Sequence, residues 1–241
     1  MRVMVLGSTG FIGGLLVKQL KADENIKQII CPVRQEVTTR PDLAPGNKVS
    51  YPIIDFEALD FEAIGHGSCD ELFLPTCDWI CLCLGTHSGK QGSYEQVDYG
   101  YTIAAAKLAR GAGTPNAMLI SSTLASAQSL SPYLRWKGKA EQALEALQFE
   151  KLAIFRPGPL LGRIEVRLSE RLGNPLLKLL AAMMGGKRSP IAPVDGSDLA
   201  SLMARQITED ATENTSGEDW QGLKRFYAGD IASSDLARQE K

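Results

Sequence analysis

Apolar runs alternate with amphipathic stretches along the first two thirds of the chain. Each run is as long as a strand and apolar enough to be covered on both faces, which is typical of a parallel sheet. Strands are predicted at residues 3–6, 28–33, 49–54, 78–84, 117–122 and 152–156. Helices are predicted between them, most clearly at 11–22, 94–110 and 131–147. This alternation predicts an α/β fold with a doubly wound parallel sheet.

Local signals mark the ends of two of these helices. The stretch 94–110 repeats its apolar residues about every 3.6 positions and stops at Gly111 and Gly113, which favour a helix end. Ser131 and Pro132 are typical of an N-cap followed by proline at the first helical position. The helix predicted at 131–147 is therefore expected to begin at Pro132.

The alternation weakens after Arg156-Pro157-Gly158. A helix is predicted near 165–184, a short strand at 191–194 and a helix near 197–207, followed by a surface loop at 208–218 and a frayed tail. The chain is expected to form one domain over residues 1–241. Its last part, from about residue 158 to 241, is expected to be a smaller region that caps the substrate.

Composition and charge exclude several classes of protein. The 241 residues are 44% hydrophobic, enough for a sizeable core, and 26 Lys and Arg against 28 Asp and Glu leave a net charge of −2. No nucleic-acid partner is expected from that balance. The longest apolar stretch of the C-terminal third, 175–185, contains Lys178 and is about half as long as a membrane span of roughly 20 residues. No membrane partner is expected.

The N-terminus and the cysteines bear on the cell compartment. The apolar run that follows Met1-Arg2 is too short for a secretory signal, so a cytoplasmic location is expected. Five unevenly spaced cysteines in a chain of this size predict reduced thiols rather than a disulfide framework. No metal is expected, because no structural zinc pattern matches the spacing of the candidate ligands His66, Cys69, Cys77 and His87.

A glycine-rich segment directly follows the first predicted strand and opens the first helix. It reads Gly7-Ser8-Thr9-Gly10-Phe11-Ile12-Gly13. Glycines let the backbone approach a pyrophosphate, while the helix N-terminus supplies N–H groups and a positive dipole end. We therefore interpret these seven residues as a dinucleotide-binding turn. The spacing GxxGxxG differs from the commoner GxGxxG, and a tight strand-to-helix turn without a ligand is the alternative.

The end of the second strand indicates which cofactor is bound. An acidic residue there binds the 2′-hydroxyl of NAD, whereas an arginine accommodates the 2′-phosphate of NADP. The residue here is Arg34, which favours NADP(H), with Arg40 and Ser8 as other phosphate contacts. A solvated strand-end charge is the alternative. Asp55, after the third strand, is a candidate acceptor for the adenine amino group or a helix cap.

Three residues could converge at the reacting end of this cofactor. Tyr133 and Lys137 are four apart in a predicted helix and so share a face, and Ser122 ends the preceding strand. A nearby ammonium lowers the pKa of a phenol from about 10, which suits Tyr133 to proton transfer. The Ser122 hydroxyl would then hold a carbonyl oxygen. A tyrosine packed beside a solvated lysine is the alternative.

The order of these motifs resembles the short-chain dehydrogenase/reductase superfamily. Within it, the compact atypical TIP30-like group is most similar, through Ser121-Ser122, the eleven-residue step to Tyr133, Lys137-Gly138 and Phe155–Gly158. The resemblance covers the chain up to about Gly162. It implies a Rossmann fold that binds NAD(P).

The resemblance also assigns roles to residues. It implies that Ser122 and Tyr133 are the catalytic pair and that Lys137 also holds the nicotinamide ribose. The backbone after Pro157 would approach the nicotinamide carboxamide. The adenosine side of the crevice would be lined by Leu84, Gly85 and Thr86.

Two points of this assignment stay open. Many relatives carry an asparagine in the helix after the fourth strand as part of a proton relay, whereas residues 97–99 here are Val-Asp-Tyr. A slip of one residue reverses side-chain direction on a strand, so Ser121 and Thr123 are alternatives to Ser122.

The resulting hypothesis is an NADP-dependent oxidoreductase that transfers hydride to or from a small carbonyl or alcohol. An NADP(H)-binding regulatory or redox-sensing protein without turnover is the alternative. A nucleotide-sugar epimerase or dehydratase is disfavoured, because the part after Pro157 is short for a sugar-nucleotide domain. The apolar segment 176–184 fits a core helix, the wall of a pocket for an apolar substrate or the contact of a homodimer.

Overall fold

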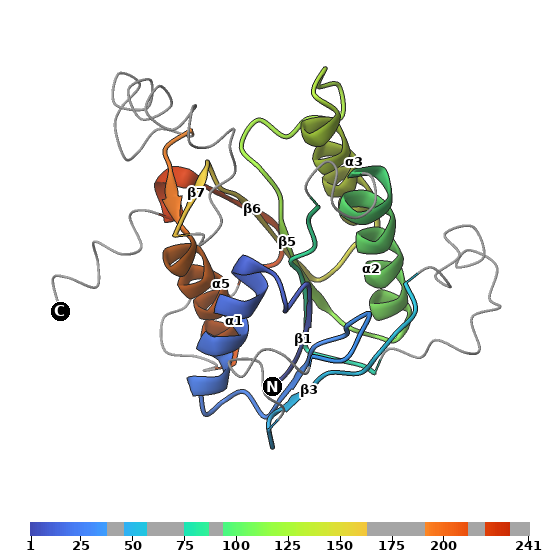
Figure 1. Cartoon of the computed structure of the whole chain (residues 1–241), viewed down its shortest axis with the longest axis vertical. Coiled ribbons are helices and arrows are strands. Elements are labelled where there is room, and N and C mark those ends of the chain that lie inside the picture. The colour runs from blue at the N-terminus through green and yellow to red at the C-terminus, as the bar shows by residue number, and fades with distance from the viewer. Residues whose placement is uncertain (38–45, 57–74, 87–93, 163–190, 212–219, 232–241) are drawn as a thin grey trace, which may run out of the picture.

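A seven-stranded, entirely parallel sheet forms the centre of the molecule (Figure 1). The computed structural model describes residues 1–37, 46–56, 75–86, 94–162, 191–211 and 220–231. The strands are β1 (Arg2–Leu6), β2 (Gln28–Ile30), β3 (Val49–Ser50), β4 (Trp79–Leu82), β5 (Asn116–Ile120), β6 (Lys151–Arg156) and β9 (Gly222–Tyr227). Their order is β3-β2-β1-β4-β5-β6-β9. The predicted doubly wound Rossmann-like sheet is confirmed.

Helices cover both faces of the sheet, and the side-chain alternation of the strands explains why. In β1, Val3 and Val5 face one layer of core and Met4 and Leu6 face the other, all fully buried. The first layer holds α1 (Phe11–Ala22) and α5 (Gly196–Ala211), which lie side by side on one face of the sheet (Figure 1). The second holds α2 (Thr102–Gly111) and α3 (Pro132–Ala146).

The helix predicted at 94–110 is in fact two segments. A π-helix, η3 (Glu95–Tyr101), precedes α2 and widens the first part of the helix. Its wider turn brings Asp98, Gly100 and Tyr101 inward, and all three are buried. Turns of this kind are rare and occur frequently at functional sites. A period of 3.6 residues does not reveal such a segment, which explains the difference from the prediction.

Several predicted strands are shorter than expected. The run 28–33 forms a strand only over β2, and 49–54 only over β3. Proline explains both ends, because Pro32 and Pro52 have no N–H to give to a ladder. A single parallel bridge between Val33 and Ile53 continues the pairing beyond them.

The C-terminal part contributes more to the sheet than the sequence indicated. Strand β9 lies in a segment expected to be a frayed tail, yet it pairs in parallel with β6 along six residues. Phe226 of β9 stacks on Phe155 of β6 with ring centroids 4.7 Å apart. The short strand predicted at 191–194 is β8 (Val194–Asp195), paired with β7 (Leu160–Leu161). The predicted helix 165–184 lies outside the described residues.

Burial determines the chemistry of the described cysteines. It raises the pKa of Cys31 to about 12 and that of Cys77 to about 11, so both thiols stay protonated at neutral pH. Cys31, Cys77, Cys81 and Cys83 are all free thiols. In the described ranges, no cluster of three potential metal ligands forms; His66, Cys69 and His87 lie outside them.

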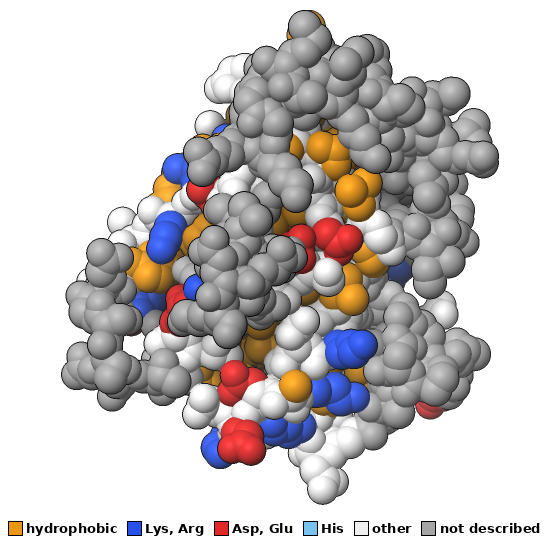
Figure 2. Space-filling view, turned by 90° about the vertical axis from the view of Figure 1, so that its left-hand side faces the viewer, with side chains coloured by type: hydrophobic (Ala, Val, Ile, Leu, Met, Phe, Trp, Pro, Cys, Tyr) orange, Lys and Arg blue, Asp and Glu red, His pale blue; other side chains and the backbone are white. Residues whose placement is uncertain are grey.

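The surface drawn in Figure 2 matches the near-neutral composition. Acidic and basic side chains lie interspersed on this face. None of the helices in the described part is long and apolar enough to cross a bilayer.

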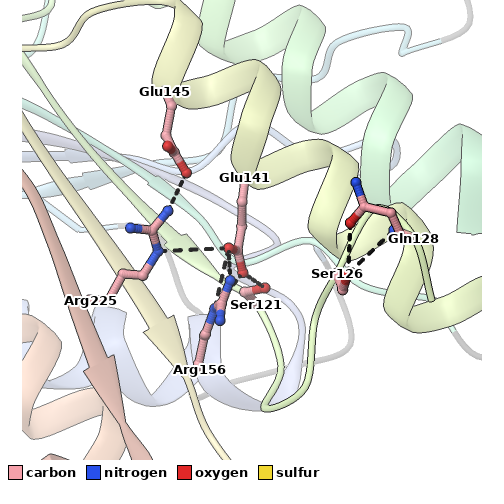
Figure 3. A network of polar contacts seen from close by, with 7 residues as sticks. All are labelled: Ser121, Ser126, Gln128, Glu141, Glu145, Arg156 and Arg225. Carbon is pink, nitrogen blue, oxygen red and sulfur yellow. Dashed lines mark hydrogen bonds and ion pairs between the residues drawn. The ribbon is translucent and has the colours of Figure 1, made fainter.

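A network of charges links α3 to the last two strands of the sheet (Figure 3). Glu141 of α3 is 2% exposed and accepts hydrogen bonds from Arg156 Nε at 3.0 and 3.2 Å. These bonds raise the pKa of Arg156. Ser121, just after β5, also donates to Glu141. Arg225 of β9 pairs with Glu145, one turn further along α3. The network therefore fixes α3 over the carboxyl ends of β5 and β6.

Gly138 of α3 tests how tightly this helix packs. A Cβ there would lie 2.3 Å from Ala127 N in the loop before α3, so we expect Gly138→Ala to lower the free energy of unfolding by about 1–3 kcal/mol. Gly111→Ala in α2 is the matched control, because a Cβ there meets nothing within 4 Å; it should stabilise by about 0.4–1 kcal/mol. Urea denaturation measures both, and equal midpoints would contradict the packing.

Glu141 and Glu145 compare a buried and an exposed member of one network. Glu141→Ala leaves the half-buried Arg156 without its carboxylate and should cost about 3–5 kcal/mol of unfolding free energy. Glu145→Ala removes a solvent-accessible pair and should cost less than about 1 kcal/mol. Guanidinium denaturation followed by circular dichroism gives both values. Similar costs for the two variants would show that burial of Glu141 does not matter.

Candidate functional site

A crevice of about 510 Å³ opens beyond the carboxyl ends of β1 and β4. The chain leaves β1 toward α1 on one face and leaves β4 toward η3 and α2 on the other, so the crevice lies at the switch point of the doubly wound sheet. This is where open α/β sheets bind ligands. Its walls are Gly7, Thr9, Gly10, Pro32, Val33, Arg34, Gln35, Glu36, Val37, Phe56, Cys83, Leu84, Gly85, Val97 and Tyr101.

The glycine turn forms one wall, and its backbone is too close to other backbone for larger residues. Gly7 has φ +78°, and a Cβ there would lie 2.5 Å from the Cys83 carbonyl oxygen. A Cβ on Gly13 would lie 2.2 Å from the Gly7 oxygen. Gly10 donates its N–H to Gly7 at 2.9 Å and has no side chain to cover the first turn of α1. The turn thus offers a helix N-terminus to an anion.

Most of the other predicted turn residues pack toward the core beneath the turn. Ser8 and Ile12 are buried, and Ile12 belongs to the core layer beneath α1. Phe11 packs against the same layer, and its ring touches the position where a Cβ on Gly196 would stand. Thr9 lines the crevice directly.

Arg34 lies in the crevice wall on the β2 side, as the sequence predicted. Glu36 lies in the same wall and was not predicted. Its signal was its place two residues after Arg34, and it gives this end of the crevice both a positive and a negative side chain. Asp55 is exposed and is not a lining residue, whereas its neighbour Phe56 is.

Lys137 lies behind the opposite end of the crevice and is 3% exposed. Its Nζ donates to the carbonyl oxygens of Ile120 at 3.0 Å and of Leu84 at 3.3 Å. It lies 2.9 Å from Oδ1 of Asp98. Two backbone carbonyls thus accept hydrogen bonds from Lys137, and the Asp98 carboxylate balances its charge. Leu84 also lines the crevice, so Lys137 contacts its wall.

Asp98 is fully buried on η3 and completes this end of the site. Its Oδ2 accepts the backbone N–H of Thr86 at 3.1 Å. Burial alone would lower the pKa of Lys137, but the Asp98 carboxylate, together with Tyr133 and Cys83, outweighs burial, so the pKa of Lys137 is raised. From the sequence, residue 98 was notable only because many relatives carry an asparagine in this region.

The serines after β5 have different partners. The Ser121 hydroxyl is buried and donates to Glu141, on the side of α3 that carries the charge network (Figure 3). Ser122 and Thr123 are half-buried. Thr123 donates its N–H to the carbonyl of Pro157 at 2.9 Å, which places the ends of β5 and β6 side by side. Pro157 itself is buried and does not line the crevice.

Tyr133 lies in the first turn of α3, one turn before Lys137, and is half-buried. Its ring packs against Tyr94 with centroids 5.4 Å apart. Its negative form would stabilise the charge on Lys137, so the two groups are electrostatically coupled. Tyr133 and Lys137 thus share a face of α3, but neither Tyr133 nor Ser122 is among the residues that line the crevice.

Known proteins resemble this chain in sequence and in fold. No protein-family model matches the chain. Among curated proteins, HTATIP2 of Rattus norvegicus is 31% identical over 206 residues, covering 84% of this chain and 81% of the relative. FMP52-1 of Scheffersomyces stipitis is 30% identical over 236 residues, covering 94% of this chain and 95% of the relative.

Solved structures agree on the fold. The oxidoreductase YlbE of Lactococcus lactis superposes with a TM-score of 0.62 at 16% identity, covering 100% of this chain and 98% of that one. WbmG of Bordetella bronchiseptica, solved in complex with NAD, gives 0.59 at 14% identity, covering 100% and 78%. At such low identity these two show the Rossmann fold alone.

The curated relatives correct one expectation and establish the family. FMP52 proteins are mitochondrial by name, so the expected cytoplasmic location is wrong. The length of the first apolar run does not indicate a compartment. The identities and coverage agree with the order of motifs in the site. The chain belongs to the TIP30-like (HTATIP2) group of atypical short-chain dehydrogenases/reductases.

Proposed function

We propose that the protein is an NADP-dependent oxidoreductase that transfers hydride to or from a small carbonyl or alcohol. One observation carries the proposal: a single crevice has the glycine turn and Arg34 in its wall, and Leu84 in the same wall accepts a hydrogen bond from Lys137. Lys137 thus connects the wall proposed to bind the cofactor with the helix that carries Tyr133.

Arg34 supports NADP over NAD. A guanidinium at the end of the second strand matches the 2′-phosphate of NADP, with which it can form paired hydrogen bonds. Glu36 in the same wall would repel that phosphate if it pointed toward it, and would accept the 2′-hydroxyl of NAD instead. The balance between these two side chains decides the cofactor, and Arg34 is the one at the expected position.

Each residue near Lys137 would have a separate role in the reaction. When bound, the nicotinamide supplies or accepts the hydride. Tyr133 would donate a proton to the carbonyl oxygen in reduction and accept it in oxidation. Ser122 would hold that oxygen by a hydrogen bond. Lys137 would keep Tyr133 in place from one turn further along α3, and the Pro157 backbone would face the nicotinamide carboxamide.

A binding protein without turnover is the second candidate. It is favoured by the contacts of Lys137, whose ammonium is held by two backbone carbonyls and by the Asp98 carboxylate rather than directed into the crevice. Such a protein would use NADP(H) as a conformational ligand. Turnover distinguishes the two candidates.

Arg34→Ala tests the cofactor. A charge-assisted contact to phosphate is worth about 1.5–3 kcal/mol, so NADPH affinity should fall about ten- to a hundredfold while NADH affinity changes little. Nicotinamide fluorescence titrations of wild type and variant measure both. Glu36→Gln is the matched control and should leave NADPH binding equal or tighter. Equal losses for NADPH and NADH would contradict a 2′-phosphate contact, and no binding of either by wild type would overturn the proposal.

Tyr133→Phe tests the chemistry. Removing the hydroxyl should lower kcat for carbonyl reduction by about 10²–10⁴-fold and leave NADPH affinity unchanged. Tyr94→Phe, its ring neighbour, is the matched control and should retain most activity. Steady-state assays over a panel of carbonyl substrates with NADPH provide the comparison. If wild type consumes no NADPH on any substrate, the binding candidate replaces the enzyme.

A further inference from the structure

The Asp98 carboxylate is the charged group of the site that the proposed chemistry does not use. It is 0% exposed, and both of its oxygens point at groups that favour a negative charge. Oδ2 accepts the Thr86 N–H at 3.1 Å, and Oδ1 lies 2.9 Å from Lys137 Nζ. A buried carboxylate with a buried ammonium is costly to form and is kept ionised only by such paired contacts.

Asp98 holds its place because η3 is a π-helix. The wider turn over Glu95–Tyr101 brings Asp98 inward, beneath the crevice wall formed by Val97 and Tyr101. Thr86 donates to it from just beyond β4, so the carboxylate is fixed from a second element. Its position is therefore defined by backbone, and Lys137 is drawn to it.

The pair changes what Lys137 does to Tyr133. An isolated ammonium one helical turn away would stabilise the phenolate and promote its formation. Asp98 supplies an equal and opposite charge 2.9 Å from Lys137, so Tyr133 experiences a pair that is close to neutral. Tyr94 contributes a ring contact to Tyr133, and among the described residues the other titratable group that acts on Lys137 is the thiol of Cys83.

We propose that Asp98 is a positioning residue that neutralises Lys137 and thereby holds the Tyr133–Lys137 pair in its doubly protonated form up to higher pH. This form contains the phenol needed to protonate a carbonyl. The inference deepens the proposed function, on which its meaning for catalysis rests, but its physical content is a titration that needs neither cofactor nor substrate.

The sign of the effect follows from charge alone. In Asp98→Asn the negative charge is lost and the volume kept. The first proton then leaves the pair at lower pH, whether Tyr133 becomes a phenolate beside the ammonium or Lys137 becomes a neutral amine beside the phenol. Both products carry one proton fewer, and the carboxylate had opposed both losses.

NMR on the full chain, labelled at tyrosine Cζ and lysine Cε, tests this directly. Tyr133→Phe and Lys137→Met identify the two signals. The lower midpoint of the pair should fall by about 1–3 pH units in Asp98→Asn. Glu95→Gln, which removes an exposed carboxylate from the same helix, is the matched control and should leave the midpoint near its wild-type value. Asp98→Glu should restore most of the wild-type behaviour. An unchanged midpoint in a folded Asp98→Asn overturns the inference.

A second pair of variants keeps the test decisive if Asp98→Asn does not fold. Lys137→Met leaves Asp98 as the remaining charge near Tyr133 and should raise the Tyr133 midpoint above wild type. Asp98→Asn/Lys137→Met removes both buried charges, which folded proteins tolerate better than one, and should bring the midpoint back down. Equal midpoints in these two variants would overturn the inference as well.

Activity separates this inference from the proposed function. For reduction, kcat/KM should be constant at low pH and fall as the pair loses its first proton, and Asp98→Asn should move that fall to lower pH. If the titration of the Tyr133–Lys137 pair shifts in Asp98→Asn but wild type shows no turnover, the enzyme proposal is contradicted and the role of Asp98 is supported. Turnover with identical pH profiles in wild type and Asp98→Asn would support the enzyme proposal and contradict the role of Asp98.

Discussion

The contact between Gly7 and the end of β4 is the constraint on which the site depends. Two backbone segments approach there so closely that a Cβ would lie 2.5 Å from the Cys83 carbonyl oxygen. This approach lets α1 begin directly beyond β1 while η3 begins on the opposite face beyond β4. The crevice exists because these two helical elements diverge from neighbouring strands. Arg34 and Leu84 then follow β2 and β4, and Lys137 reaches Leu84 from α3.

Much of this arrangement was predictable because it is local in sequence. The glycine turn, Arg34 and the start of α3 at Pro132 each depend on a few consecutive residues whose backbone preferences are strong. The doubly wound, parallel character of the sheet followed from the alternation of strands and helices along the chain. The same local character explains why the ends of β2 and β3 were misplaced, since Pro32 and Pro52 interrupt apolar runs that otherwise continue.

What sequence reasoning missed depends on partners far away in the chain. Strand β9 contains Lys224 and Arg225, which conceal its apolar Phe226 from a search for apolar runs, and its pairing with β6 decides its state. The role of Asp98 was missed for the same reason. Whether a carboxylate is a surface charge or a buried partner of a lysine depends on η3, whose wider turn has no periodic signature.

Strand β9 also has a consequence for how the molecule forms. The edge of β6 gains its neighbouring strand, and Phe155 its ring partner, only when residues 222–227 are present, well after β6 in the chain. Until then the growing chain holds a parallel sheet with an open, hydrogen-bonding edge. Long-range parallel pairing is slow, and an open edge is a template for pairing with other chains. The described sheet is therefore most exposed to pairing with other chains in the interval before β9 is available.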